Sequence, residues 1–285
     1  MKSIHLAVGR FNIDIMVRIE KMPDIDEFLT TDLMEIMPGG AAVNYAVMIN
    51  RLGHSSKLLA KVGKSSLTQS LMESIAEMGV GLEYIEEVNA PQSMALIFLR
   101  KNGKISIVRK LGASMLISAE DVKKYFGLFD VIHFASIPST VVVRDPMAKI
   151  ISYDPGPFSK DVNDVDVDVL YINEKESSLI NLNKVKAKIV VIKMGEKGAK
   201  VITESQECIA EAYRVDNVVD TTGAGDVFDA TFNYGLAENL PLEETLKLAV
   251  TASALKVQRL GGINSPTLSE VHEALKIYKP KVECR

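Results

Sequence analysis

The sequence contains few of the residues that usually hold metal ions or staple a fold together. It has two cysteines and four histidines among 285 residues. Cys208 and Cys284 form no CxxC or other metal-binding spacing, and so few cysteines in a chain of this size favour a reducing compartment over a disulfide framework. The histidines are dispersed and form no HExxH or other ligand pair. We therefore expect a structural or surface role for each histidine.

Long apolar runs and blocks of positive charge are also missing. No uncharged apolar stretch approaches the roughly 18–20 residues that cross a bilayer, and the N-terminal stretch from Met1 to Arg10 is too short for a signal peptide. The net charge is −4 without any dense Lys/Arg block, whereas nucleic-acid binding usually requires a basic face. We expect a cytoplasmic globular protein whose partners include neither a membrane nor a nucleic acid.

Two common nucleotide-binding motifs are absent as well. The first predicted strand is followed by Gly9-Arg10-Phe11-Asn12, which lacks the GxGxxG loop of an NAD-binding dehydrogenase. Gly63-Lys64-Ser65 imitates the end of a P-loop, but Leu58 stands where that motif requires its first glycine. The sequence therefore argues against both a dehydrogenase and a P-loop NTPase.

The order of the apolar segments is typical of an α/β protein. Two of the expected helices end just before Gly53 and Gly79, and glycine is favoured directly after a helix C-terminus. The expected strands are 4–8, 131–134, 150–153, 169–172 and 189–192, and the expected helices are 39–52, 67–78, 227–237, 242–260 and 268–277. This alternation predicts a mostly parallel central sheet flanked by helices on both faces.

Two regions do not suit a parallel sheet. Residues 15–19 alternate apolar and polar side chains, as a half-exposed strand does, and two β-rich segments flank Asn102-Gly103, the dipeptide best suited to a type I′ hairpin turn. We expect a small β-sheet lid made from residues 15–38 and 92–110. The large α/β domain would then comprise residues 1–14, 39–91 and 111–285, and the open edges of the lid would suit a homodimer.

The strongest chemical signal is the string Asp220-Thr221-Thr222-Gly223-Ala224-Gly225-Asp226, which lies where a strand turns into an apolar helix. The two glycines let the chain present consecutive N–H groups, and the helix N-terminus adds about half a positive charge. Such a cradle suits the negative charge on a phosphoryl group in transfer. The carboxylate of Asp226 could accept the proton of an attacking hydroxyl, although an N-cap is the simpler interpretation.

This string resembles the C-terminal signature of the ribokinase (PfkB-type) carbohydrate kinase family, and four further matches stand in family order. Gly9 to Asp14 is similar to the opening Gly-x-x-x-x-Asp, and Pro38 to Asn44 to Gly-Gly-x-x-x-Asn. Asn173 to Glu176 resembles the Asn-x-x-Glu magnesium motif, and Gly195 to Gly198 the nucleotide-loop Gly-x-x-Gly. Together they span nearly the whole chain. The resemblance implies a ribokinase-like fold and transfer of the γ-phosphate of ATP to a hydroxyl.

The resemblance also implies which residues hold the acceptor and catalyse the reaction. The acceptor hydroxyls would be held by Asp14, Gly39, Gly40 and Asn44. A carboxylate and an amide supply the directional acceptors and donors that polyols need, and paired glycines let a substrate approach the main chain. The catalytic residues would be Asp226, as general base, and Gly223, Ala224 and Gly225, whose amides would stabilise the developing negative charge.

ATP and its metal ions are implied for other matched residues. The nucleotide would contact Lys193, Gly195, Gly198, Gly223 and Gly225. Asn173 and Glu176 would orient magnesium through water, which suits an ion that keeps much of its hydration shell. Asp220 and Thr222 match positions that bind a monovalent cation in some members of the family. Lys193 is a departure, because the family usually has threonine there; it would either contact ATP phosphates as a point charge or simply end a strand.

The acceptor is the least determined part of this prediction. The compact length and the segments 153–156 and 261–264 look similar to archaeal nucleoside kinases of the family, with ribose or another free sugar close behind. A phosphosugar would need basic residues near the lid, and Arg10, Arg100 and Arg109 are available. The alternative function is a non-catalytic sugar or nucleotide sensor on the same fold, against which the intact glycine cradle argues.

Overall fold

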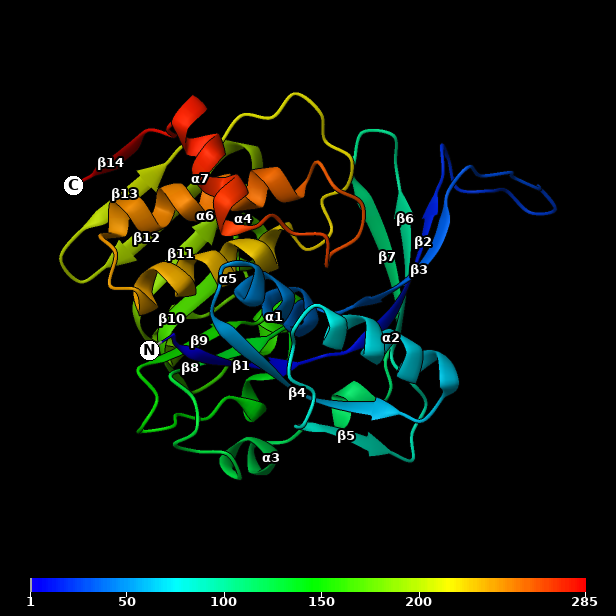
Figure 1. Cartoon of the computed structure of the whole chain (residues 1–285), viewed down its shortest axis with the longest axis horizontal. Helices are drawn as coiled ribbons and strands as arrows, with labels where there is room; N and C mark the ends of the chain where they lie inside the picture. The colour runs from blue at the N-terminus through cyan, green and yellow to red at the C-terminus, as the bar shows by residue number, and fades with distance from the viewer. Residues whose placement is uncertain (1) are drawn as a thin grey trace.

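A computed structural model of the chain describes residues 2–285 (Figure 1). Its centre is a ten-stranded sheet in the order β14-β13-β12-β11-β10-β9-β8-β1-β4-β5. The strands from β11 to β5 in this order are parallel, whereas β12, β13 and β14 are antiparallel. The bounds are β1 Ile4–Gly9, β4 Ser55–Gly63, β5 Ile85–Val88, β8 Val131–Ala135, β9 Ile150–Asp154, β10 Val165–Asn173, β11 Val185–Lys193, β12 Ala199–Thr203, β13 Glu207–Ala210 and β14 Val282–Cys284.

Both faces of this sheet are covered, which explains why its strands are apolar on both sides. In β1, for example, Ala7 packs into the core beneath helices α1 and α5, while Leu6 and Val8 pack into the core on the opposite face. The long helices are α1 Ala41–Arg51, α2 Ser66–Glu77, α5 Ala224–Ala237, α6 Leu242–Lys256 and α7 Leu268–Ile277. The short helices are α3 Ala119–Lys123 and α4 Glu174–Ser177, with 3₁₀ turns at Ala113–Leu116, Ser139–Val141, Gly156–Asp161, Leu182–Lys184 and Gly195–Lys197. The predicted α/β fold with a mostly parallel sheet is confirmed.

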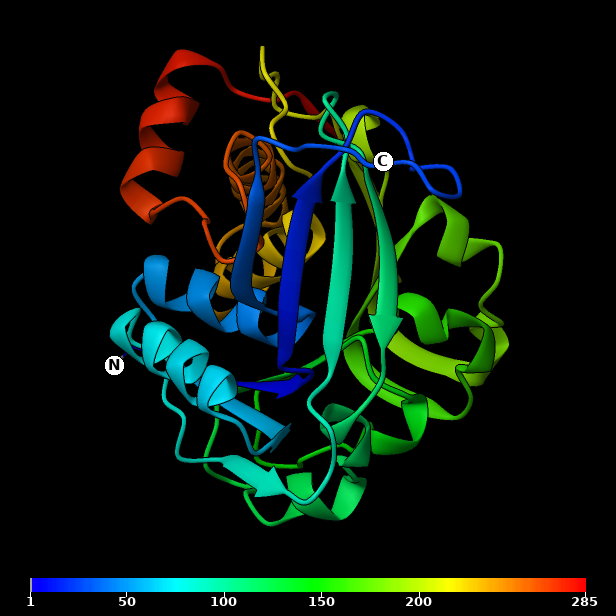
Figure 2. The same cartoon turned by 90° about the vertical axis from the view of Figure 1, so that its right-hand side faces the viewer.

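A second sheet of four strands stands beside the main body, in the order β3-β2-β6-β7 (Figure 2). Its strands are β2 Asn12–Arg18, β3 Met34–Gly39, β6 Met94–Leu99 and β7 Ile105–Lys110. The β6–β7 hairpin closes with hydrogen bonds from Arg100 N to Lys104 O and from Gly103 N to Arg100 O, both 2.9 Å. Gly103 has a φ of +75° but Asn102 is not left-handed. The expected type I′ turn is therefore wrong, since that turn needs two left-handed residues; the loop has three residues with one left-handed glycine.

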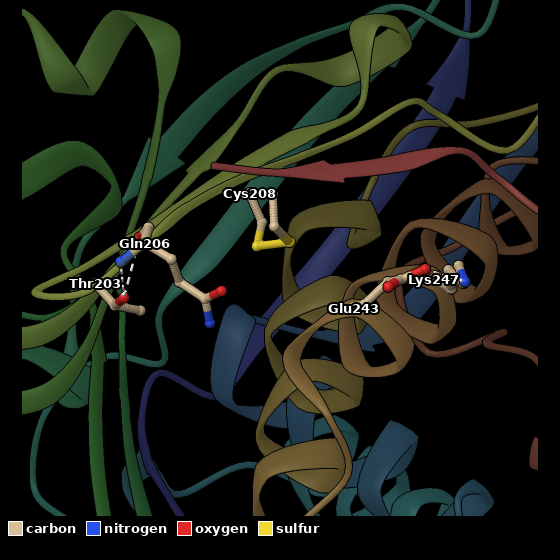
Figure 3. The surroundings of a disulfide bond; sticks show 6 residues. Thr203, Gln206, Cys208, Glu243 and Lys247 are labelled. Carbon is tan, nitrogen blue, oxygen red and sulfur yellow. Dashed lines mark hydrogen bonds and ion pairs between the residues drawn. A yellow bond between two sulfur atoms is a disulfide. The ribbon is translucent and has the colours of Figure 1, made fainter.

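The antiparallel extension of the main sheet carries a disulfide that the cysteine count did not predict. Cys208 on β13 pairs in register with Cys284 on β14, and the two are joined as a disulfide (Figure 3). The expectation of two cysteines in the reduced form is therefore wrong. Disulfides persist in oxidising compartments and in intracellular proteins of hyperthermophiles, so the cysteines alone assign no compartment. Within residues 2–285, no helix combines the length and apolarity needed to cross a bilayer.

Breaking this disulfide is expected to lower stability without changing catalysis. The bond closes a loop with a sequence separation of 76 residues, so its loss releases chain entropy in the unfolded state. We expect Cys284→Ser to reduce the free energy of unfolding by about 2–4 kcal/mol, measured by denaturant titration. Reductant should destabilise the wild type similarly and leave the variant unchanged; equal sensitivity of both proteins to reductant would contradict the bond.

Candidate active site

The carboxyl ends of the central parallel strands meet at a cavity of about 520 Å³. This is the edge of an open α/β sheet at which ligands generally bind. The predicted residues that line the cavity are Asn173, Glu176, Lys193, Gly195, Gly223 and Gly225. Arg109, Ser136, Asp154, Gly156 and Pro157 complete its wall. Three segments of the predicted nucleotide and anion site are thus brought together from distant parts of the chain.

Helix α5 begins at this cavity with a cradle of main-chain N–H groups. Gly223 is its N-cap, with a φ of +77° and no side-chain cap. A Cβ at Gly223 would lie 2.8 Å from the Cα of Gly262, so both the conformation and the space require glycine. Ala224, also predicted for the cradle, does not line the cavity, and its N–H donates to the carbonyl oxygen of Thr221 at 3.3 Å. Gly223 and Gly225 do line the cavity, and no side chain caps the helix there.

Asp226 lies in the first turn of α5 but does not cap the helix. Its Oδ2 accepts a hydrogen bond of 2.7 Å from Nδ2 of Asn44 on α1, so the N-cap interpretation is wrong. Burial raises the pKa of Asp226, and the hydrogen bond from Asn44 partly opposes this rise. A carboxylate with a raised pKa is a stronger proton acceptor, which is the property that a general base needs.

The residues predicted to hold the acceptor gather around the start of α1, next to Asp226. A Cβ at Gly39 would lie 1.9 Å from Oδ2 of Asp14, and Gly40 has a φ of +102°. Oδ1 of Asp14 and Oδ1 of Asn44 are buried, and neither has a hydrogen-bond partner among residues 2–285. The donating hydroxyls of a polyol would satisfy two such unpartnered acceptors near Asp226. Burial raises the pKa of Asp14 to about 7, although the positive charge of Arg10 acts to lower this pKa.

Lys193 forms a buried ion cluster at the floor of the cavity. Its Nζ lies 2.6 Å from Oδ2 of Asp154 and 2.9 Å from each oxygen of Asp229. Burial opposes the ionisation of Asp154, but the charge of Lys193 and the hydrogen bonds at Asp154 together outweigh burial and lower the pKa of Asp154. Burial raises the pKa of Asp229 well above its usual value. The cluster therefore joins one ammonium to two buried carboxyl groups, whose pKa values are shifted in opposite directions.

The ammonium of Lys193 also lies against the glycine cradle. A Cβ placed on Gly225 would be 3.3 Å from Nζ of Lys193. Since glycine leaves this position open, the positive charge is exposed to any group that binds at the cradle. Lys193 thus does more than end β11, because it joins two buried carboxylates to the proposed phosphoryl site.

The two glycines predicted for the nucleotide loop lie in different environments. Gly195 lines the cavity with a φ of +60°, and a Cβ there would meet nothing within 4 Å. Gly198 does not line the cavity, and a Cβ there would lie 1.9 Å from the carbonyl oxygen of Ala210. Glycine is therefore required at position 198 by this close approach and by a φ of +102°. Gly198 lies in the turn between β11 and β12, where its carbonyl oxygen accepts a hydrogen bond from Met194 N.

Asn173 and Glu176 reach the cavity but also cap helix α4. Oδ1 of Asn173 accepts from Glu176 N at 3.0 Å, and Oε2 of Glu176 accepts from Asn173 N at 2.8 Å. This capping box uses only Oε2 of Glu176, so the other carboxylate oxygen makes no hydrogen bond in the box. Burial, and after it the charge of Asp154, raise the pKa of Glu176. A cation near Glu176 and Asp154 would therefore stabilise the ionised form of both side chains. The donors present thus suit magnesium.

Asp154, Asp229 and Arg109 were not predicted as site residues from the sequence. Asp154 ends β9 at the carboxyl edge of the sheet, a position that could have marked it. Asp229 follows Asp226 by three residues on α5, so it lies on the same helix face. No sequence signal indicated the direction of Arg109. Asp220 and Thr222 were predicted but lie buried outside the cavity wall. Also outside this wall lie the predicted base and acceptor residues, Asp226, Asp14, Gly39, Gly40 and Asn44.

Comparisons with known proteins agree on one family. The model of the pfkB family carbohydrate kinases matches residues 5–153 and 167–268. A ribokinase from Arabidopsis thaliana is 27% identical over 96% of this chain and 80% of its own length. The structure of a ribokinase from Thermotoga maritima superposes with a TM-score of 0.80 at 24% identity, covering 97% of this chain and all of that one. A nucleoside kinase from Methanocaldococcus jannaschii, a member of the ribokinase family, has a TM-score of 0.77 at 22% identity over 97% of this chain and 99% of its own.

Proposed function

Because this chain belongs to the pfkB family of carbohydrate kinases, we propose that it transfers the γ-phosphate of ATP to a hydroxyl of a nucleoside or small sugar. The observation that carries the proposal is the position of Asp226. This carboxylate lies in the first turn of α5 beside the glycine cradle, accepts a hydrogen bond from Asn44, and is close enough to Asp14 for its charge to raise the pKa of that residue. A base between an anion site and a polyol site is the arrangement that phosphoryl transfer to a hydroxyl requires.

In this mechanism, Asp14 and Asn44 orient the acceptor so that one hydroxyl faces Asp226. Asp226 takes the proton of that hydroxyl while the hydroxyl oxygen forms a bond to the γ-phosphorus of ATP. The bond between the γ-phosphorus and the β-phosphate oxygen breaks at the same time, and ADP leaves. The N–H groups of Gly223 and Gly225 and the ammonium of Lys193, which all line the cavity, stabilise the charge on the transferring group. Asn173 and Glu176 would hold magnesium through water, and the ion would neutralise charge on the ATP phosphates.

The four-stranded sheet is proposed to act as a lid. Asp14 belongs to β2 and Arg109 to β7, so movement of this sheet would carry residues of both the acceptor site and the cavity wall. Closure would exclude water, which otherwise competes as the phosphate acceptor. Exposed apolar side chains at the lid, such as Met34, Ile36 and Val108, are consistent with a homodimer formed through the same sheet.

A phosphorylated sugar is a second candidate acceptor, favoured by Arg10. This side chain is 4% exposed, and its Nε has no hydrogen-bond partner; it makes no ion pair within residues 2–285. Its guanidinium lies 5.9 Å from the ring centroid of Phe158. Burial and then the charge of Arg109 lower the pKa of Arg10 to about 10, so it stays charged at neutral pH. An unpaired buried cation is unfavourable, and an anionic substituent on the acceptor would offset that.

Arg109 supplies a second cation for the same substituent. In the lid sheet, Asp14 pairs with Ala95, and Ala95 pairs with Arg109. Directly opposed residues point to the same face of a sheet, so Asp14 and Arg109 flank the small side chain of Ala95. Arg109 also lines the cavity, so it lies near both the cavity and the predicted acceptor residue Asp14.

The function is tested by an acceptor panel with ATP and magnesium. The panel contains ribose, 2-deoxyribose, the common nucleosides, and pentose and hexose phosphates, and the readout is kcat/KM for each. Phosphorylation of none of them would refute the proposed function. If a phosphosugar is the acceptor, Arg109→Met should lower its kcat/KM by about 10- to 100-fold, the loss of one charge-assisted hydrogen bond, with neutral acceptors unchanged. An equal loss for all acceptors with a raised KM for ATP would assign Arg109 to the nucleotide instead.

A further inference from the structure

The loop that begins the glycine cradle rests on a completely buried lysine that no part of the mechanism uses. Lys256, the last residue of α6, has an exposed fraction of 0%. Its Nζ donates hydrogen bonds of 3.0 Å to the main-chain oxygens of Asp220 and Arg259. The same Nζ lies 3.8 Å from Oδ2 of Asp220, whose side chain is also fully buried. A single positive charge is thus surrounded by two carbonyl oxygens and one carboxylate.

These are the ligands that a dehydrated monovalent cation takes in proteins. Carbonyl oxygens replace the hydration shell of potassium, and a carboxylate balances its charge. The sequence predicted such a cation at Asp220 and Thr222, but both carboxylate oxygens of Asp220 already accept hydrogen bonds from the protein. Oδ1 of Asp220 accepts from both N and Oγ1 of Thr222, at 2.8 and 2.6 Å, and Oδ2 accepts from Gly261 N at 2.7 Å. The residues present therefore do not suit a bound monovalent cation beside Asp220.

We propose that the ammonium of Lys256 replaces a monovalent cation, so that this kinase works without potassium or sodium. An ammonium is a compact point charge with three N–H donors. Two of these donors meet the carbonyl oxygens, and the third side of the ammonium faces the carboxylate of Asp220. The charge sits at the C-terminal end of α6, where the helix dipole also favours a cation.

The position of Lys256 connects it to catalysis through the main chain. Asp220, whose carbonyl oxygen it binds, is three residues before Gly223, the N-cap of α5. Asp220 is held from the other side by a hydrogen bond of 3.0 Å from its N to Val257 O. Fixing Asp220 therefore fixes the entry to the cradle. Lys256 is a positioning residue, since it touches neither the cavity wall nor Asp226 by any hydrogen bond.

The first test compares wild-type rates in salts of different cations. All counterions, including those of ATP, are supplied as tetramethylammonium, which is too large to enter a buried site, and potassium or sodium chloride is then added at constant ionic strength. We expect kcat and kcat/KM to differ by less than about twofold among the salts, because the charge is already in place. Stimulation of the wild type by about tenfold or more with either ion would overturn the proposal.

The second test uses two substitutions of the same residue. Lys256→Ala opens a space among the three oxygens, whereas Lys256→Met fills it with an apolar chain. In tetramethylammonium both variants should lose about tenfold or more in kcat, somewhat less than the ~10²–10³ for removing an oxyanion donor itself. Potassium should restore kcat in Lys256→Ala only, and should also raise its melting temperature by binding the folded state.

The outcomes of this pair separate the proposal from a structural role. A folded Lys256→Ala enzyme that no monovalent cation restores would mean that the lysine only packs and bonds the loop, and would overturn the proposal. Equal restoration of both variants by salt would also overturn it, because Lys256→Met leaves no room for an ion. If both variants fail to fold, the wild-type comparison decides, since it requires no substitution. None of these readouts depends on which acceptor the enzyme uses.

Discussion

Asp226→Asn should retain ATP binding but lose at least ~10²-fold in kcat, the lower range for the loss of a general base. The amide keeps the shape of the carboxylate and can still accept the hydrogen bond from Asn44, so neither the packing of α5 nor the glycine cradle should change. What is lost is the ability to take a proton from the acceptor hydroxyl. Steady-state kinetics measure the turnover, and calorimetric titration measures the ATP affinity.

Asp216→Asn is the matched control, because it makes the same chemical change at an exposed loop residue before the cradle. Its kcat should equal that of the wild type. The wild-type rate should also depend on pH in a definite direction. Since burial raises the pKa of Asp226 and only the ionised form is a base, kcat/KM should fall as the pH falls through that raised pKa. Near-normal turnover of Asp226→Asn would contradict the assignment.

Lys193→Met is expected to produce the largest loss of stability of any single substitution considered for this chain. The side chain holds the buried carboxyl groups of Asp154 and Asp229, and the methionine cannot replace its charge. Removing one partner from a buried ionic cluster typically destabilises a protein by about 3–5 kcal/mol. Denaturant titration at neutral pH measures this change in the free energy of unfolding.

Lys276→Met is the control for this prediction, because Lys276 is exposed and pairs only with the exposed Glu273. Such surface pairs contribute about 0–1 kcal/mol. Lowering the pH should narrow the difference between Lys193→Met and the wild type, because protonation of Asp154 removes the charge that the variant leaves unpaired. A loss below ~1 kcal/mol at neutral pH would contradict the prediction, because it would show that the two buried carboxyl groups tolerate the missing ammonium.

The order of strands and helices was predictable because it depends on local apolar patterns, whereas their edges and pairings depend on distant contacts. The parallel strands from β8 to β11 were located within a few residues of their predicted bounds. Strand β14 was not predicted, because Val282–Cys284 is too short to show an alternation of apolar and polar residues. It is a strand because it pairs with β13, which is distant in the sequence. The disulfide was missed for the same reason, since two cysteines 76 residues apart carry no local signal.

The candidate site divides in the same way. The glycines at Gly39, Gly40 and Gly223 were found because the conformations and close approaches that they permit leave a sequence pattern. The ion cluster was not, because Asp154, Lys193 and Asp229 come from three separate elements and lack a shared motif. Lys256 was also missed, since a lysine at the end of a helix usually lies in water, and only the folded arrangement reveals that this one does not.

The disulfide between Cys208 and Cys284 turns the last part of the chain into a covalent ring. This ring contains α5, α6 and α7, and with them the proposed base Asp226 and the buried Lys256. A protease cut in any loop of the ring would therefore leave both fragments attached to the molecule, and only reduction would separate them. The C-terminal end of the chain, which contributes no side chain to the cavity wall, thus keeps these three helices tethered to the central sheet.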